Sequence, residues 1–229
     1  MAPVKKQFHR YLHTKGYALY WILFAYIVAG FFFPIIGWLA IICMIAPVAF
    51  AFKRGRWWCG NACPRGSMYD RLLAKYSPHK PIPGFVRTRV FRSFMVLFIF
   101  AMFGVQMYSA WGDWGAMGMV FWKIIVITTI VGIILSFIYA PRTWCSMCPM
   151  GTLSSWASPE KAPLPAGFSN IRVDATCQMK CRSCARVCPM QITPYDARGM
   201  EEGYLHPDCI KCGKCTIACP LKIMNLKRN

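Results

Sequence analysis

The sequence has few acidic residues, with eight Asp and Glu against 27 Lys and Arg, and only four histidines. The histidines are His9, His13, His79 and His206, and all four lie outside the long apolar runs of the chain. A haem held by two histidines in a helix bundle needs ligands inside such runs, so this kind of site is not expected. The chain also has no Gly-x-Gly-x-x-Gly turn and no P-loop, which argues against nicotinamide, Rossmann-type flavin and ATP.

Apolar residues make up 56% of the chain, yet its formal net charge is +19. Both values are compatible because apolar and charged residues are segregated along the sequence. Apolar runs occupy residues 17–52, 93–111 and 119–140, with Lys123 as their one charged residue. Their lengths approach what an α-helix needs to cross a hydrocarbon core of about 30 Å, so we expect a membrane protein. The first run is too long for a cleavable signal peptide and lacks a small-residue cleavage motif.

We interpret the runs as four transmembrane helices arranged as two hairpins. The first hairpin comprises Tyr17–Phe33 and Ile35–Phe52 with a tight turn at Pro34, and the second comprises Ser93–Trp111 and Met119–Ala140. One kinked and tilted helix over the first run is the alternative, because membrane helices tolerate proline.

With four spans, residues 1–16, 53–92 and 141–229 share one side of the membrane, and they contain 26 of the 27 Lys and Arg residues. The positive-inside rule then places both termini and every cysteine pair in the cytoplasm of a prokaryotic cell, in a multi-pass protein of the cytoplasmic (inner) membrane. The predicted domains are a membrane domain over 1–157, a proline-rich linker over 158–170 and a soluble domain over 171–229.

Eight cysteines of the soluble domain form two motifs of one design. The motifs are Cys177-x3-Cys181-x2-Cys184-x3-Cys188-Pro189 and Cys209-x2-Cys212-x2-Cys215-x3-Cys219-Pro220. Three closely spaced cysteines supply three thiolates of a cubane cluster, and the fourth comes from the Cys-Pro of the other motif. We therefore assign one [4Fe–4S] cluster to Cys177, Cys181, Cys184 and Cys219, and a second to Cys209, Cys212, Cys215 and Cys188.

This pattern resembles the bacterial two-[4Fe–4S] ferredoxin, which implies a small α+β fold of paired β-hairpins and short helices. The first gap, Cys177-x3-Cys181, is one residue longer than in that family. Structural zinc sites are the alternative, but zinc proteins usually use separated Cys-x2-Cys knuckles. Disulfides are not expected at such short spacings followed by proline. No nucleophile or general-base motif accompanies these cysteines.

Two further cysteine pairs follow the two predicted hairpins. The stretch Arg56-Trp57-Trp58-Cys59-Gly60-Asn61-Ala62-Cys63-Pro64-Arg65-Gly66-Ser67 parallels Arg142-Thr143-Trp144-Cys145-Ser146-Met147-Cys148-Pro149-Met150-Gly151-Thr152. The membrane domain therefore looks like a duplicated module whose halves are related by an axis along the membrane normal. Such an axis brings the pairs together, so we predict a third [4Fe–4S] cluster on Cys59, Cys63, Cys145 and Cys148. A structural zinc, a redox-active dithiol pair and unmetallated thiols are the alternatives.

The whole arrangement resembles the NapH/NosR/CcoG group of membrane 4Fe–4S proteins. This resemblance implies an electron-transfer subunit of a quinol dehydrogenase or quinone reductase type of complex, which relays electrons between the quinone pool, or a membrane partner, and a redox partner protein. The expected partners are other subunits of a membrane redox complex, membrane lipids and quinone or quinol. The pair Cys145-x2-Cys148 is one residue shorter than the group's usual spacing, and the extra flavin domain of the NosR type is missing.

Two other functions remain open from the sequence. The chain could be an assembly or maturation factor, such as a metal reductase for a respiratory enzyme, or a non-redox anchor that uses metal structurally. Residues 171–229 carry ten Lys and Arg against five Asp and Glu, which suits an acidic protein or anionic lipid. Nucleic acid is not an expected partner of a membrane-tethered domain. Asp70 and Arg71 follow the first pair on a possible interfacial helix, Ser67–Tyr76. They could contact a quinone headgroup or a proton path, but we interpret them as residues of a solvated helix face.

Overall fold

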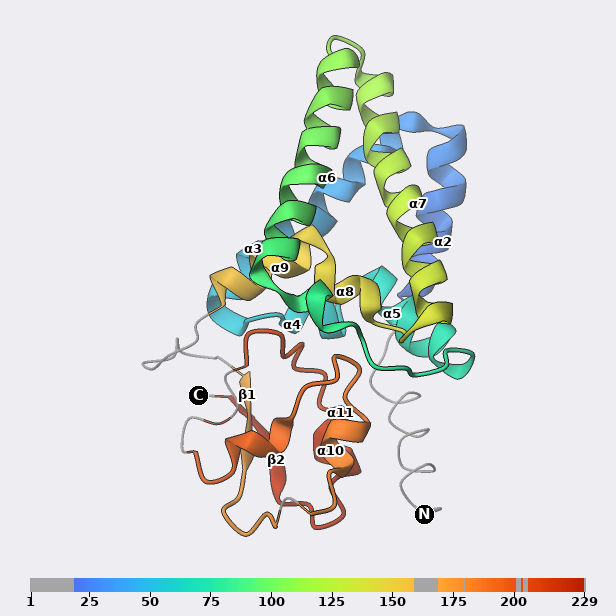
Figure 1. The fold of residues 1–229 in the computed structure, drawn as a ribbon. Coiled ribbons are helices and arrows are strands. Elements are labelled where there is room, and N and C mark those ends of the chain that lie inside the picture. The colour runs from blue at the N-terminus through green and yellow to red at the C-terminus, as the bar shows by residue number, and fades with distance from the viewer. Residues whose placement is uncertain (1–18, 159–168, 179, 201–202, 204–205, 229) are drawn as a thin grey trace.

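The computed structural model describes residues 19–158, 169–178, 180–200, 203 and 206–228 (Figure 1). Predictions for residues 1–18 and for the linker at 159–168 lie outside these residues. The described elements, in chain order, are α2 (Tyr20–Phe32), η1 (Pro34–Leu39), α3 (Ala40–Arg54), α4 (Trp57–Asn61), α5 (Pro64–Arg71), η2 (Leu73–Lys75), η3 (Gly84–Arg87), α6 (Arg89–Ser109), α7 (Trp114–Ile138), α8 (Thr143–Met147), α9 (Pro149–Ala157), β1 (Ser169–Val173), α10 (Ser183–Arg186), η4 (Pro194–Ala197), α11 (Lys214–Ala218) and β2 (Met224–Arg228).

Three helical stretches of the described chain are long and apolar enough to cross a membrane. They are Pro34–Arg54, which joins η1 to α3, and the helices α6 and α7. At 1.5 Å per residue, a 21-residue helix such as α6 covers about 31 Å. Helix α2 is apolar but has 13 residues, and the predicted start of its span at residue 17 is not described. The fourth span therefore stays a prediction.

The chain breaks between α2 and η1 as the turn at Pro34 predicts. Phe33 is extended (φ −125°, ψ 90°) and Pro34 occupies the first turn of the next helix, so a single kinked helix is wrong. Helix α6 begins four residues before the predicted Ser93, because Thr88 caps it by accepting from the Phe91 amide. Helix α7 begins five residues before Met119, where Asp113 accepts from the Gly115 amide.

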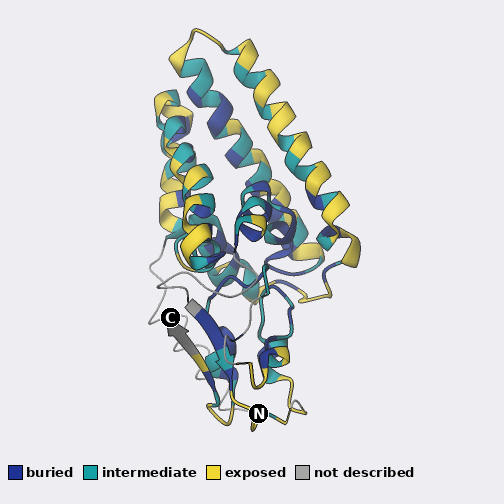
Figure 2. Ribbon diagram, turned by 90° about the vertical axis from the view of Figure 1, so that its left-hand side faces the viewer, coloured by how far each residue is buried: buried dark blue, intermediate teal, exposed yellow. Residues whose placement is uncertain are grey.

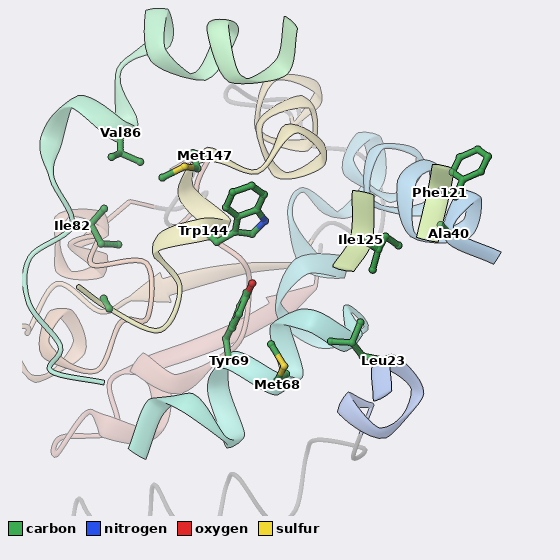
Figure 3. Packing of buried hydrophobic residues seen from close by; sticks show 11 residues of the cluster. Leu23, Ala40, Met68, Tyr69, Ile82, Val86, Phe121, Ile125, Trp144 and Met147 are labelled. Carbon is green, nitrogen blue, oxygen red and sulfur yellow. The ribbon is translucent and has the colours of Figure 1, made fainter. Parts of the chain in front are cut away.

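The outer faces of the long helices expose large apolar side chains (Figure 2). Val90, Leu97 and Tyr108 on α6 are 81%, 71% and 84% exposed, which suits contact with lipid rather than water. The buried core of this membrane unit includes Leu23, Phe121, Ile125, Tyr69 and Trp144, which come from α2, α7, α5 and α8 (Figure 3). The core thus extends from the helices to the segments that carry the membrane-unit cysteine pairs.

The short helices α4 and α5 after the first hairpin correspond to α8 and α9 after the second. Helix α5 contacts α2 and α7, while α9 contacts α6 and α3. Helix α2 of the first half corresponds to α6 of the second, and α3 corresponds to α7. The contacts of α5 therefore match those of α9, so a pseudo-twofold relation connects the two halves. The helices α4, α5, α8 and α9 gather at one end of the long helices (Figure 1).

The C-terminal unit lies against that same end (Figure 1). Strands β1 and β2 pair antiparallel, with Ile171 opposite Leu226, and they bring the two ends of the unit together. The short helices α10 and α11 contact each other, and each carries one cysteine of a motif, Cys184 and Cys215. Strand β1 begins at Ser169, inside the range predicted as linker.

Candidate metal centre

The two cysteine pairs of the membrane unit occupy equivalent local structures. Cys59 lies in α4 and Cys145 in α8, while Cys63 and Cys148 cap the following helices α5 and α9. In both cases the proline after the cysteine takes the first helical position, where its missing N–H costs no hydrogen bond. The Cys63 sulfur accepts from the Gly66 amide at 3.5 Å. The Cys63 sulfur therefore faces the amide groups at the start of α5.

The fold brings these four cysteines, hereafter the membrane-proximal cysteines, together as predicted from the internal repeat. The pKa of the Cys145 thiol is raised to about 12, chiefly by burial and also by the neighbouring Cys63, Cys148 and Cys59, against the opposing effect of Arg142. Burial likewise raises the pKa of Cys59, which Cys63 and Cys148 also influence. The thiols of Cys59 and Cys145 are thus coupled electrostatically to the other two cysteines, and they become thiolates only when strong positive charge, such as bound iron, compensates them.

Two buried arginines cross between the halves of the membrane unit. Arg56, three residues before Cys59, donates to the carbonyl oxygen of Cys145 at 2.7 Å. Arg142, three residues before Cys145, donates to the carbonyl oxygen of Cys59 at 2.7 Å. Each side chain is only 1% exposed. Each half therefore fixes the cysteine loop of the other half.

Glycines make room for this crossing. A Cβ atom on Gly151 would lie 2.6 Å from Nη2 of Arg56 and 3.2 Å from the carbonyl oxygen of Cys145. On Gly66, a Cβ atom would lie 2.8 Å from the carbonyl oxygen of Cys59 and 3.0 Å from Nη1 of Arg142. The glycine of each Cys-Pro-x-Gly motif is therefore required by the arginine of the opposite repeat.

The C-terminal unit brings Cys188, Cys209, Cys212 and Cys215 together, hereafter the near set. The pKa of Cys188 is raised to about 12, chiefly by burial, and Cys212 and Cys209 contribute to this rise. The pKa of Cys215 is raised by burial and by Cys212, Cys209 and Cys188. The predicted crossing of Cys188 to the second motif therefore agrees with the positions of the side chains.

The remaining cysteines, Cys177, Cys181, Cys184 and Cys219, are hereafter the far set. Burial raises the pKa of Cys184, and Cys181 and Cys177 raise it further. Cys219 and Cys177 pack against the same apolar core as Cys184; the assignment of Cys219 as the fourth ligand stays a prediction. Cys181 is the one exposed cysteine of the chain, so this set lies nearest to solvent.

Two carboxylates join the C-terminal unit to the membrane unit. Asp208, directly before Cys209, accepts from Arg56 at 2.8 Å and from Arg92 at 2.7 and 3.0 Å. Burial opposes ionisation of Asp208, but Arg56 and Arg92 outweigh it and lower its pKa to about 2. Asp70 on α5 pairs with Arg142 at 2.8 Å and with Lys214 at 3.1 Å.

Further contacts place the near set against the membrane unit. Arg87 donates to the carbonyl oxygen of Met190 at 2.6 Å, and the Gln191 side chain bonds the backbone of Ile82 and Lys80 at 2.8 Å each. A Cβ atom on Gly60 would lie 2.1 Å from the carbonyl oxygen of Ile210, so the backbones of the two units touch there. The linker prediction suggested separate units, whereas the structure joins them through buried contacts.

The cysteines fit iron–sulfur clusters better than single ions. Within the described part of the chain, no three Cys, His, Asp or Glu side chains converge closely enough to hold one metal ion. A tetrahedral zinc site needs four ligands at about 2.3 Å from one atom. In a cubane each thiolate binds a different iron, so a wider spacing suits it. Clusters held by Cys thiolates supply one-electron transfer, at potentials set by hydrogen bonds and solvent exposure.

A cavity of about 650 Å³ lies on the membrane side of the membrane-proximal cysteines, all four of which line it. Its walls are apolar side chains of the membrane helices, among them Leu23, Leu39, Phe103 and Ile125 from α2, η1, α6 and α7. Arg65, Tyr69 and Trp144 also line the cavity. The sequence alone gave no indication of this cavity.

Sequence reasoning missed the docking carboxylates. No motif in the sequence points to Asp208, and a solvated helix face is the wrong interpretation of Asp70, since its side chain is 12% exposed and paired with two cations. The sequence contains one indication that Asp208 has a role. Acidic residues are rare in this chain, which has only eight, and Asp208 directly precedes the motif cysteine Cys209.

Two family models match separate parts of the chain. A family model described as a 4Fe-4S binding domain matches residues 36–83 and 114–163, one stretch around each membrane-proximal pair. A model described as a 4Fe-4S dicluster domain matches residues 169–220. An uncharacterized protein of Methanocaldococcus jannaschii is 26% identical over 216 residues, which cover 85% of this chain and 78% of the relative. No solved structure matches. The chain therefore combines 4Fe–4S ferredoxin-type domains with helices long and apolar enough to span a membrane.

Proposed function

We propose that the chain is a membrane-bound electron-transfer subunit of the NapH/NosR/CcoG type. It relays electrons between the quinone pool, or a membrane partner, and a redox partner protein. The proposal includes a [4Fe–4S] cluster on each of the three cysteine sets, and a multi-pass position in the cytoplasmic membrane of a prokaryote with all three sets on the cytoplasmic side. The 4Fe–4S domains and the apolar helices support its iron–sulfur and membrane parts.

One observation carries the proposal: Arg56 binds both units at once. Its guanidinium donates to the carbonyl oxygen of Cys145 and to the carboxylate of Asp208, the neighbour of Cys209. Cys59 and Cys145 also pack against the apolar core of the C-terminal unit. The near set is therefore held directly beside the membrane-proximal cysteines, and the far set continues the series to the surface at Cys181.

Charged residues of the chain stabilise the thiolate form of the proposed cluster ligands. Arg56 and Arg142 place buried positive charge beside the membrane-proximal thiols, which stabilises thiolate ligands. Cys209 and Cys215 of the near set are buried, while Cys181 of the far set is exposed and accessible to a soluble partner. We find no catalytic constellation among the described residues, so the chain acts as one subunit of a larger assembly.

Iron and sulfide analysis of protein purified without oxygen tests the number of clusters. Three cubanes give about twelve iron atoms per chain, and two give about eight. We expect twelve, and we expect Cys59→Ser to lose about four while the EPR signals of the other clusters persist. Cys43→Ser is the matched control, because Cys43 lies in α3 outside the cysteine sets. A wild-type content of eight, unchanged in Cys59→Ser, would exclude the third cluster.

Electron exchange with quinone is tested separately. We expect added quinol to reduce the clusters, or added quinone to oxidise the reduced protein, as followed by EPR. Failure of both reactions in the presence of the native partner subunits would exclude direct quinone chemistry. A deletion strain that retains quinol oxidation but contains an unmetallated respiratory enzyme would identify a maturation factor instead.

A further inference from the structure

The C-terminal unit contains two Cys-Pro turns of the same local structure. Residues 188–191 follow α10 and residues 219–222 follow α11. In each turn the amide of the last residue donates to the carbonyl oxygen of the cysteine, from Gln191 at 3.0 Å and from Lys222 at 3.2 Å. Both residues also have positive φ angles, 50° and 55°. The two turns, hereafter the near turn (188–191) and the far turn (219–222), are therefore equivalent parts of an internal repeat.

The near turn is an interface with the membrane unit. Arg87 donates to the carbonyl oxygen of Met190 at 2.6 Å, and the Gln191 side chain accepts from the Ile82 amide at 2.8 Å. Met190 is 2% exposed. A Cys-Pro turn of this unit thus serves as a contact surface for the domain next to it.

The far turn has the same backbone but an uncovered surface. Leu221, which corresponds to Met190, is 64% exposed. Lys222, which corresponds to Gln191, is exposed as well, and so is Pro220. Apolar side chains at the centre and polar ones at the rim are the usual composition of a protein interface. The far turn therefore presents to solvent what the near turn presents to the membrane unit.

The packing of the two short helices places the far turn beside the loop of Cys181. Cys188 follows α10 and interacts with Cys209 and Cys212, which precede α11. The end of α10 therefore lies at the start of α11. Because the two helices contact each other, they run in opposite directions, and the end of α11 lies at the start of α10. The far turn follows α11, and Cys181 precedes α10.

Exposed cations surround the cysteines of the far set. Lys180 and Arg182 flank Cys181 in the chain. The Arg186 side chain donates to the carbonyl oxygen of Cys181, and Lys222 belongs to the far turn itself. All four cations, hereafter the far cations, are exposed.

Acidic residues are scarce around the far set. Asp174 is the one acidic residue within three positions of a far-set cysteine, and its carboxylate accepts from the amide and the hydroxyl of Thr176 at 2.9 Å each. The far cations therefore outnumber the neighbouring carboxylates four to one. Complementary charge steers association and orients the partners, so the complement of this surface is acidic.

An acidic protein fits this surface better than anionic lipid does. The near turn, and not the far turn, contacts the membrane unit. Electron exchange also needs a second redox centre close to Cys181, the exposed cysteine of the far set, and lipid headgroups supply none. Contacts between electron-transfer proteins are small and transient, so an apolar side chain within a charged rim is sufficient for them.

We propose that the far turn and the far cations, hereafter the far face, bind an acidic one-electron carrier protein. Leu221 lies at the centre of the contact, and the far cations pair with carboxylates of the carrier. The exchange moves one electron between the far set and the carrier, so that one is oxidised and the other reduced, with no bond made or broken. This inference rests on the proposed function and specifies the chemistry of its redox partner.

Binding of carriers of opposite charge tests the far face. The anaerobically purified holoprotein is held in nanodiscs of zwitterionic lipid, and binding is measured by surface plasmon resonance. The probes are a plant-type [2Fe–2S] ferredoxin, which is acidic, and cytochrome c, which is basic. We expect the ferredoxin to bind with an affinity that falls as salt rises, and cytochrome c not to bind.

Variants locate the binding on the molecule. At low salt, the double variant Arg182→Glu, Lys222→Glu should weaken ferredoxin binding about tenfold or more, and Leu221→Ser should weaken it several-fold. The matched control is the double variant Lys75→Glu, Arg89→Glu, which inverts two exposed charges of the membrane unit and should bind more tightly than the far-face double variant by the same factor. Iron content and EPR spectra confirm that each variant retains its clusters.

The other outcomes overturn the far face or the proposed function separately. Equal loss of binding in the control would show attraction by the total charge of the chain and would overturn the far face. Binding of phosphatidylserine vesicles that the far-face double variant abolishes, while ferredoxin still binds, would assign the surface to lipid and also overturn it. If quinol reduces the clusters but all far-face variants bind like the wild type, the relay stands and the far face fails. If the variants weaken binding but the bound ferredoxin exchanges no electron with the clusters in either direction, the far face stands as a binding surface and the relay fails.

Discussion

Arg142 reaches from the second repeat to the carbonyl oxygen of Cys59 in the first, at 2.7 Å. Its other nitrogens bind both oxygens of Asp70, at 3.2 and 2.8 Å. Arg56 makes the reciprocal contact with Cys145 and pairs with Asp208. Each arginine therefore links a cysteine loop of the other repeat to a carboxylate at the boundary with the C-terminal unit. The membrane-proximal centre and the docking surface are parts of one hydrogen-bonded network.

The first prediction concerns the shape of these arginines. Lysine keeps the charge but cannot bind a carbonyl and a carboxylate with a planar fork. We expect Arg56→Lys and Arg142→Lys each to lose up to about four iron atoms per chain, the content of one cluster, while the near and far sets retain theirs. Iron analysis and EPR provide the measurement. Arg89→Lys, at an exposed position, is the control, and full iron content in both buried variants would contradict the prediction.

A second prediction concerns the glycines under the arginines. A methyl group on Gly66 or Gly151 meets a guanidinium nitrogen and a cysteine carbonyl oxygen at 2.6–3.2 Å. Such overpacking typically costs about 1–3 kcal/mol and should displace the arginine from the carbonyl. We expect Gly66→Ala and Gly151→Ala to lower the thermal stability of the holoprotein and to change the EPR spectrum of the membrane-proximal cluster.

Gly84→Ala is the matched control for these variants, because no atom lies within 4 Å of its added methyl group. Wild-type melting temperature and EPR spectra in Gly66→Ala and Gly151→Ala would show that the loops have room to adjust.

The third prediction concerns docking through Asp208. Asp208→Asn removes the charge that pairs with Arg56 and Arg92, which are 1% and 6% exposed. A buried cation left without its partner costs about 3–5 kcal/mol, so the two units should separate more readily. Hydrogen exchange should accelerate at residues 188–192 and 206–215. Asp174→Asn, which changes an exposed carboxylate within the C-terminal unit, should leave exchange there unchanged; equal exchange in both variants would exclude a docking role.

The proximity of the two membrane-proximal cysteine pairs was predictable from the sequence because spacing constrains local structure. Cys-Pro places a cysteine at a helix start with proline at the first position, and both Cys63 and Cys148 occupy such sites. The repeat of Arg, Trp, Cys and Cys-Pro-x-Gly predicted that both pairs would meet, and their electrostatic coupling agrees. The long apolar runs predicted membrane helices, although capping by Thr88 and Asp113 extends two of them beyond those runs.

The docking and the cavity could not be predicted in the same way. Arg56 and Asp208 are 152 residues apart in the chain, and no periodicity or spacing relates them. Asp70 follows the first cysteine pair on what reads as a polar helix face, but Lys214 of the C-terminal unit covers it. The cavity depends on how four helices pack above the cysteines. Such contacts depend on tertiary packing and therefore leave no local pattern in the sequence.

The last prediction concerns the dependence of the C-terminal unit on iron. Its buried core consists of about ten residues, and three of these are the cysteines Cys184, Cys209 and Cys215. Its sheet has two strands of five residues each. A core of this size supplies little stability, so ligand bonds to iron should provide much of the folding free energy. We expect chelation under reducing conditions to abolish amide protection in residues 169–178 and 206–228. The helices α6 and α7 should keep theirs, because lipid or detergent and helix packing stabilise them without metal. Hydrogen exchange by mass spectrometry measures both regions in one sample, and undiminished protection of the C-terminal unit after complete iron loss would show that its apolar core and its docking to the membrane unit suffice.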